Sequence, residues 1–210
     1  YSPGAGRNRG YDFEGATRIN LSPGGYLWDA AAEAGITYRD YGEFASNTGT
    51  PSSIPETDTN TCTGPIAHSY TGTTVPDGQV LCFGPTSVNP ITTPNLVGHV
   101  DPRFRAYDLR FREADRVAEW QREFDQFVAS DSLPQLELMR LPNDHTSGTT
   151  AGRPTPQAYV AENDWALGKV IDILSHSTYW SSTAVFVTED DAQNGPDHVD
   201  AHRTTSLVIS

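Results

Sequence analysis

The sequence predicts an α/β fold in which a largely parallel sheet is flanked by helices in layers. Short β-favourable segments recur at 36–41, 136–141 and 183–187, and the later ones are separated by long helical segments. Strands that alternate with helices of this length are typical of a parallel sheet. Ligands of such sheets bind beyond the carboxyl ends of the strands. Polar clusters follow two of the strands, so the sequence predicts a site at that edge.

The first helix and strand lie near the N-terminus. Residues 1–24 are rich in Gly, Pro, Asn and Arg, and we expect them to run over a surface. Segment 25–35 predicts a short helix that ends at Gly35, because glycine commonly follows the last helical turn. Segment 36–41 alternates and contains β-favourable residues, which predicts a strand.

Residues 45–100 predict an irregular insertion. Thr, Ser, Pro, Gly and Asn dominate there, and neither the helical nor the strand period is sustained. A loop of this length in a compact domain is usually functional or inserted. It contains the two cysteines of the chain, Cys62 and Cys82. We favour a disulfide between them, which would stabilise the fold by about 3 kcal/mol, over two unpaired thiols, because the surroundings resemble a secreted protein.

The second half of the chain predicts two amphipathic helices and further strands. The first helix follows Asp108 and ends near 132–134, and its buried stripe is Val117, Trp120, Phe124 and Phe127. The second begins at Thr155-Pro156, with proline at the first helical position. Its expected buried face is Val160, Leu167, Ile171 and Leu174. Segment 183–187 predicts a buried strand, and 207–209 predicts the start of another.

Length and charge limit the classes of function. The chain has 210 residues and a net charge of −13 with a pI near 4.7, so one core is expected. This acidity disfavours nucleic acid and anionic membrane surfaces as partners, since both are bound by clustered Lys and Arg. No apolar stretch has the length of a transmembrane helix. Because the chain starts without Met and ends in an apolar run, we interpret it as part of one domain of a longer protein.

Two polar clusters carry the candidate chemistry. The first is 143–148, Asn-Asp-His-Thr-Ser-Gly, and the second contains Glu189, Asp190, Asp191, His198, His202 and Arg203. Adjacent carboxylates repel one another, and a divalent cation removes this repulsion. The alternative interpretation is a solvated acidic surface with histidines that cap turns. If the two clusters follow neighbouring parallel strands, they converge on one edge.

The cation cannot be assigned from the ligand types alone. Carboxylate together with imidazole favours zinc or manganese, whereas carboxylate and carbonyl oxygens also accept calcium or magnesium. An EF-hand is excluded, because the third and twelfth positions counted from Asp190 are Ala192 and Ala201. We therefore expect a site assembled from several strand ends.

Three segments together resemble a known family. They are LPNDHTSGT at 141–149, PTPQAYVAENDWALGKVIDIL at 154–174 and TAVFVTEDDAQNGPDHVDAHR at 183–203. In this order they resemble the bacterial phosphoesterase family, which includes phospholipase C and acid phosphatase relatives within the alkaline phosphatase superfamily. The segments 11–18, 25–44 and 98–104 are similar to the subgroup often attached to a β-propeller. The resemblance covers most of the chain outside 45–97.

The resemblance implies a metal-dependent phosphoric ester hydrolase with an alkaline phosphatase-like fold. In that family a Ser or Thr nucleophile attacks phosphorus, and a metal bound by Asp and His assists it. Asp190 and Asp191 match the adjacent metal-binding acids. Asp144 and His145 match a strand-end pair that offers a metal ligand or a phosphate contact. The remaining matches are His198 and His202 as downstream catalytic histidines and Arg203 as a phosphate contact.

The chain departs from the family pattern in one important respect. The nucleophile and an early Glu-Asn metal pair are not found, and Thr146 and Ser147 are interpreted as turn residues. We therefore expect this chain, with half of the site, to hydrolyse phosphate esters poorly or not at all by itself. Two other functions stay open: a secreted divalent-cation-binding or surface-interaction module, and a degenerate, inactive phosphatase domain. The expected location is secreted or periplasmic.

Overall fold

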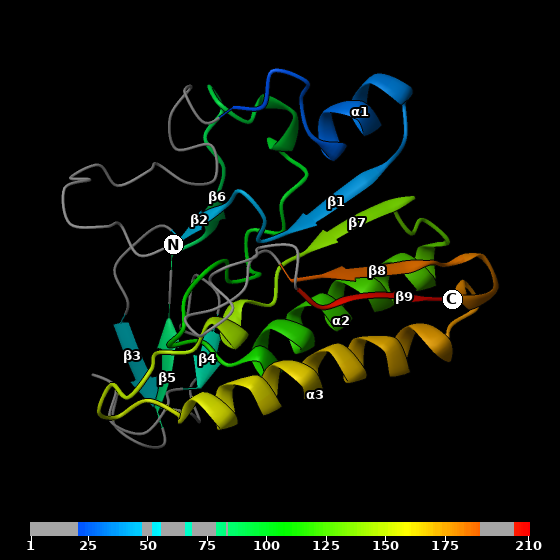
Figure 1. The fold of residues 1–210 in the computed structure, drawn as a ribbon. Helices are drawn as coiled ribbons and strands as arrows, with labels where there is room; N and C mark the ends of the chain where they lie inside the picture. The colour runs from blue at the N-terminus through cyan, green and yellow to red at the C-terminus, as the bar shows by residue number, and fades with distance from the viewer. Residues whose placement is uncertain (1–20, 48–51, 56–65, 69–78, 83, 190–203) are drawn as a thin grey trace. The chain divides into compact units, whose positions relative to one another are not determined.

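The computed structural model describes residues 21–47, 52–55, 66–68, 79–82, 84–189 and 204–210 (Figure 1). The described residues up to Gly168 form one compact unit, and those from Lys169 onward form a second. The first unit contains α1 (Leu27–Ala34), β1 (Tyr38–Tyr41), β2 (Ser46–Asn47), β3 (Ser52–Pro55), β4 (Ile66–His68), β5 (Gln79–Cys82), β6 (Thr86–Ser87), the 3-10 helix η3 (Pro94–Leu96), α2 (Glu113–Ser130), β7 (Leu136–Met139), η4 (Pro142–His145) and the start of α3 (Pro156–Ser175). The second contains the end of α3, η5 (Trp180–Ser182), β8 (Val185–Thr188) and β9 (Ser206–Ile209).

The predicted α/β class is confirmed at the level of a mixed fold with small sheets. Among the described strands, β1 and β7 form the parallel pair, with Tyr38 opposite Leu136 and Tyr41 opposite Met139 (Figure 1). The other described pairs, β2–β6, β3–β5–β4 and β8–β9, are antiparallel. The expected predominance of parallel strands is therefore not found in the described residues. No helix among them is long and apolar enough to cross a membrane.

The segment 45–100, expected to be irregular, contains short strands in its described parts. Residues 99–101, where this segment ends, also extend the parallel pair, because the Asp40 N–H donates to the His99 carbonyl and the Asp101 N–H donates to the Asp40 carbonyl, both at 2.9 Å. The resulting bridge between Asp40 and Val100 is parallel. The segments that follow Val100 and β7 therefore leave at the same edge, which is where ligands bind in parallel sheets.

The predicted helix boundaries are close to those observed. α1 begins where the Tyr26 N–H donates to the Asp29 carboxylate at 2.9 Å, and it ends at Gly35, whose φ is 68°. α1 buries Trp28 and Ala31 against a core that includes Tyr38, Leu96 and Val100. α2 buries the predicted Val117, Trp120 and Phe124, whereas Phe127 is half-buried.

The predicted buried face of α3 is confirmed at Leu174 and is wrong by one position at its other three residues. The buried residues are Tyr159, Ala166, Val170 and Leu174, whereas Val160 is 49% exposed. Tyr159 displaces Val160 because its hydroxyl donates to the Leu109 carbonyl at 2.7 Å, which holds the ring against the 105–111 segment. A valine has no group that could make this bond.

The strand predicted at 183–187 is observed at Val185–Thr188 (β8), but it is not the fully buried strand that the sequence predicts. In β8 the residues alternate between half-buried and exposed, and Phe186 is 74% exposed. β8 pairs antiparallel with β9, with Val185 opposite Ile209. Successive side chains of a strand point to opposite faces, so a two-stranded ladder covered on one face leaves Phe186 on the other.

Gly42 follows β1 at a position that excludes a side chain. Its φ is 94°, and an added Cβ would lie 3.2 Å from the Ala106 Cα and from the Phe104 ring. Because both the backbone angle and the contact oppose alanine, Gly42→Ala is expected to lower the free energy of unfolding by about 1–3 kcal/mol. The matched control is Gly168→Ala in α3, which meets open space and should stabilise by up to about 1 kcal/mol. Urea unfolding of both variants tests this, and equal effects would contradict it.

Candidate functional site

Two segments at the carboxyl edge of β1 and β7 bring polar groups together. The first is 105–111, which leads into α2, and the second is 140–147, which follows β7. Pro142 opens η4 in the second segment, and its fixed φ suits the first helical position. Because only two residues separate η4 from β7, the polar side chains of η4 stay close to the end of that strand.

Arg116 of α2 holds the first segment in place. It is fully buried, and its guanidinium donates to the carbonyls of Arg105 (2.7 Å), Ala106 (3.0 Å), Asp108 (2.9 Å) and Phe111 (3.0 Å). It also pairs with the buried Glu113 at 3.3 Å. Five N–H donors in a rigid fork are suited to several backbone acceptors at once. One side chain therefore sets the path of the loop.

Asn143 connects the second segment to the same network. Its N–H donates to Glu113 at 2.8 Å, and its side-chain amide donates to the Phe111 carbonyl at 3.2 Å. Its Oδ1 accepts from Arg116 at 3.3 Å, and its amide also donates to Glu162 of α3 at 3.3 Å. α2, α3 and both loops thus share one buried hydrogen-bond network, which fixes the loops relative to each other.

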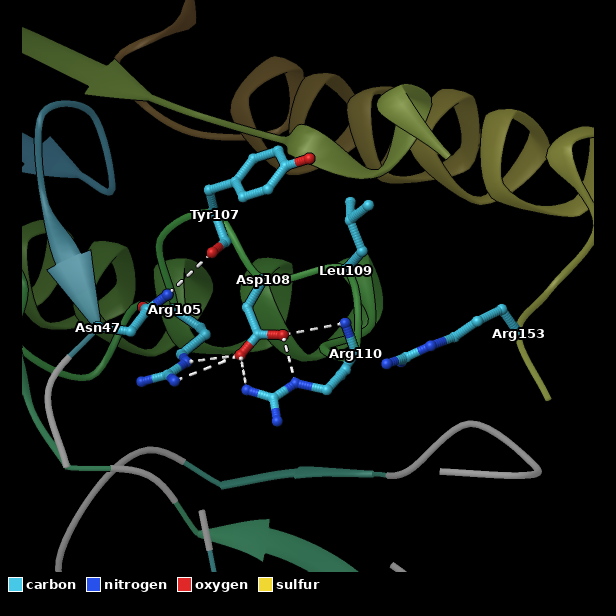
Figure 2. Close-up of a pocket in the computed structure, with 7 residues that line it drawn as sticks. All are labelled: Asn47, Arg105, Tyr107, Asp108, Leu109, Arg110 and Arg153. Carbon is cyan, nitrogen blue, oxygen red and sulfur yellow. Dashed lines mark hydrogen bonds and ion pairs between the residues drawn. The ribbon is translucent and has the colours of Figure 1, made fainter. Parts of the chain in front are cut away.

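A pocket of about 460 Å³ lies along the first segment (Figure 2). Its lining consists of Asn47, Arg105, Tyr107, Asp108, Leu109, Arg110 and Arg153. The carboxylate of Asp108 lies between the guanidinium groups of Arg105 and Arg110, and Arg153 extends towards Arg110 from a different segment (Figure 2). Three guanidinium groups and one carboxylate leave an excess of two positive charges in a protein that is acidic overall.

The charges in this pocket are fixed by mutual contact. Arg110 binds Asp108 through Nε and Nη2, both at 2.9 Å, and Arg105 contacts the same carboxylate at 3.3 Å. Burial acts to raise the pKa of Asp108, but the hydrogen bonds and charges of Arg110 and Arg105 outweigh it and lower that pKa below its ordinary value. Burial lowers the pKa of Arg105 to about 10, so Arg105 stays protonated at neutral pH.

Asp144 and His145, the predicted residues of the first cluster, lie in η4 at the carboxyl edge. Asp144 is half-buried and accepts the N–H of His145 at 3.1 Å; His145 is exposed. The His145 ring meets the Tyr107 ring edge-on, with centroids 5.4 Å apart. Its Nδ1 lies 3.1 Å from the Thr146 carbonyl. An Nδ1–H donated to a carbonyl leaves the Nε2 lone pair for a metal, which is the usual arrangement of a histidine ligand.

Thr146 follows this pair in a strained conformation. Its φ is 60° and its ψ is 170°, a region that β-branched residues rarely adopt. Such strain costs about 1–3 kcal/mol, persists only where the surroundings fix it, and clusters at functional sites. Its hydroxyl accepts the N–H of Gly148 at 3.2 Å, as expected for a turn residue.

Most of the second predicted cluster falls outside the described residues. These positions are Asp190, Asp191, His198, His202 and Arg203. Cys62 also lies outside the described residues, whereas Cys82 lies in β5. The Cys62–Cys82 disulfide therefore stays a prediction. The described part of the chain contains no group of three or more His, Cys, Asp or Glu side chains that could hold a metal. The convergence of the two clusters also stays a prediction.

Sequence reasoning missed the arginine pocket and its anchor Arg116. A signal was present: five of the chain's 14 Lys and Arg residues fall within 103–116, in an otherwise acidic protein. Comparisons of the chain with protein-family models, with curated proteins and with solved structures found no match.

Proposed function

We propose that this chain forms part of a metal-dependent phosphoric ester hydrolase. The observation that supports this best is that Asp144 and His145 lie in η4, the short helix that follows β7 at the carboxyl edge of a parallel pair. A carboxylate beside an imidazole whose Nδ1 faces a carbonyl is a donor set that zinc or manganese accepts. The resemblance of the segments 141–149, 154–174 and 183–203 to phosphoesterases supplies the reaction class.

The proposal gives each predicted residue a role. By the resemblance, Asp144, Asp190 and Asp191 are the candidate metal ligands, and His145 offers a further ligand or a phosphate contact. His198 and His202 are the candidate catalytic histidines. Arg203 contacts a phosphate oxygen through its planar fork. A bound metal would supply charge neutralisation at the phosphate oxygens and activation of a nucleophile. Thr146 and Ser147 are not assigned as the nucleophile, because they are used in the turn that follows η4.

Metal binding by the purified chain tests the proposal. Isothermal titration with Zn²⁺ and Mn²⁺ is expected to show binding, and Asp144→Asn is expected to weaken it by at least about tenfold, as the loss of a metal ligand or its support does. Asp164→Asn removes the same charge from an exposed position of α3 and is the matched control. Asp144→Asn and Asp164→Asn variants with equal metal affinities would contradict the assignment.

Orthovanadate separates the hydrolase from a cation-binding module. A catalytic metal keeps an open coordination position, whereas a structural ion is enclosed by protein ligands. We expect vanadate to bind only when the metal is present, and turnover of an aryl phosphate by this chain to be very slow or absent. Metal binding without vanadate binding would favour the cation-binding module instead.

A further inference from the structure

We propose that the pocket formed by Arg105, Arg110 and Arg153 binds the phosphate group of a small molecule. This site is separate from the metal-dependent chemistry proposed above: it needs no metal and uses none of the residues proposed to hold one. Its lining has two positive charges in excess, and arginine forks match the spacing of phosphate oxygens. The proposal therefore concerns a second binding site in the same compact unit.

Contacts within the protein orient two of the arginines that line the pocket. Asp108 holds Arg110 through two contacts of 2.9 Å and Arg105 through two of 3.3 and 3.4 Å, while Arg116 fixes the carbonyls of Arg105 and Asp108. Preorganised charges lose little conformational entropy on binding. A single carboxylate shared between two arginines therefore orients both.

Arg153 supplies a guanidinium group that Asp108 does not bind in the structure. Its Nη1 is buried and has no hydrogen-bond partner among the described residues. A buried donor without a partner costs free energy that a ligand acceptor would recover. Arg153 extends towards Arg110 from a different segment (Figure 2) and lines the same pocket, so both arginines are placed to contact one ligand there.

The size and a second polar group limit the ligand class. A pocket of about 460 Å³ is larger than a phosphate ion and falls in the range of small-molecule sites. Asn47 donates its amide to the Tyr107 carbonyl at 2.9 Å, and its Oδ1 is buried with no partner within the described part of the chain. This Oδ1 accepts a donor from the ligand. The geometry therefore points to a phosphate monoester that also carries a hydroxyl or amino group.

The experiment measures binding of inorganic phosphate, glycerol phosphate and glycerate to the purified chain. Isothermal titration is carried out at constant ionic strength with EDTA present, so that a failed metal site does not affect the result. We expect glycerol phosphate to bind most tightly, and Arg153→Gln to weaken it by about tenfold or more. The affinity of Arg153→Lys for glycerol phosphate should lie between those of the parent and of Arg153→Gln, since lysine keeps the charge but lacks the planar guanidinium fork. Asn47→Ala should weaken the binding of glycerol phosphate but not the binding of inorganic phosphate.

Arg103→Gln is the matched control, because it removes the same charge from a half-exposed arginine that does not line the pocket. Its affinity for glycerol phosphate should stay within about twofold of the parent, since its exposed guanidinium pairs with Glu119 and salt screens exposed charges. Urea unfolding confirms that each variant is folded. Three results would overturn the proposal: no binding of either phosphate probe, equal losses in Arg153→Gln and Arg103→Gln, or glycerate binding as tight as glycerol phosphate.

Discussion

Replacing Arg116 with methionine is expected to lower the free energy of unfolding by about 3–5 kcal/mol, the range for removing one partner of a buried ion pair. The side chains of Arg116 and Glu113 are both fully buried, 3.3 Å apart. The substitution leaves Glu113 without its cation and removes the guanidinium donor from four backbone carbonyls of the 105–111 segment, of which the Phe111 carbonyl keeps its bond from Asn143. Burial already raises the pKa of Glu113, and losing Arg116 would raise it further.

A double variant separates the stability lost through the unpaired Glu113 carboxylate from the stability lost through the carbonyls. Adding Glu113→Gln to Arg116→Met removes the uncompensated carboxylate, so part of the stability should return, whereas the carbonyls stay without the guanidinium donor. The single control is Arg122→Met on the same helix, where a partly exposed arginine pairs with Glu119. That pair should contribute less than about 1 kcal/mol. Urea unfolding gives the free energy of unfolding of the parent and of the three variants. Similar losses of stability in Arg116→Met and Arg122→Met would refute the role of Arg116 as the anchor of the 105–111 segment.

The elements that sequence reasoning predicted are those with a strong local signal. α2 was predicted because Val117, Trp120 and Phe124 recur at the helical period, and all three are buried. α1 was predicted because Gly35 provides the left-handed residue after its last turn. β1 and β7 were predicted from short β-favourable runs, and they pair with each other. In each case one segment carries the information by itself.

The features that were missed depend on contacts between distant segments. The buried face of α3 follows from the bond of Tyr159 to the Leu109 carbonyl, 50 residues earlier in the chain. The arginine pocket combines the 105–110 segment with Asn47 and Arg153, which no local pattern relates. The role of Arg116 is equally hidden, because an arginine on an amphipathic helix is expected to face solvent.

The candidate metal site lies between these two cases. Asp144 and His145 were predicted from a polar run after a strand, and the structure places them at that strand end. Their proposed partners, Asp190 and Asp191, were predicted on the same grounds from the strand that ends at Thr188. Strand-end position can be read locally, whereas convergence of two strand ends depends on strand order, which the sequence does not encode in any one segment.

The stability of the protein is expected to fall as the pH rises from about 4 to 8, with a slope of up to about 1.4 kcal/mol per pH unit for each proton that the folded state retains. Asp40 of β1 is fully buried; its Oδ1 accepts the Glu43 N–H at 3.2 Å, and its Oδ2 has no partner among the described residues. Burial, together with the charge of Glu43, raises the pKa of Asp40 to about 8. Burial also raises the pKa of Glu137 to about 7.

The direction of this dependence follows from proton binding. Between the ordinary carboxyl pKa values and these raised ones, the folded protein holds protons that the unfolded chain has released, so raising the pH favours unfolding. The stabilisation is complete below pH 4 for Asp40 and is lost through pH 8. Asp101, whose pKa is also raised by burial, acts in the same direction. Asp108 acts in the opposite direction, because its lowered pKa causes stability to be lost in acid.

Asp40→Asn tests the source of the slope, since the amide keeps the shape of the carboxyl group and does not titrate. Urea unfolding at pH 5 and pH 8 should show a smaller loss of stability on raising the pH in Asp40→Asn than in the parent protein. Glu137→Gln should flatten the same dependence between pH 5 and pH 7. Asp125→Asn, at an exposed position of α2, is the matched control for the substitution itself. A slope in Asp40→Asn as steep as in the parent and in Asp125→Asn would show that the buried carboxyl group of β1 is not the group that titrates.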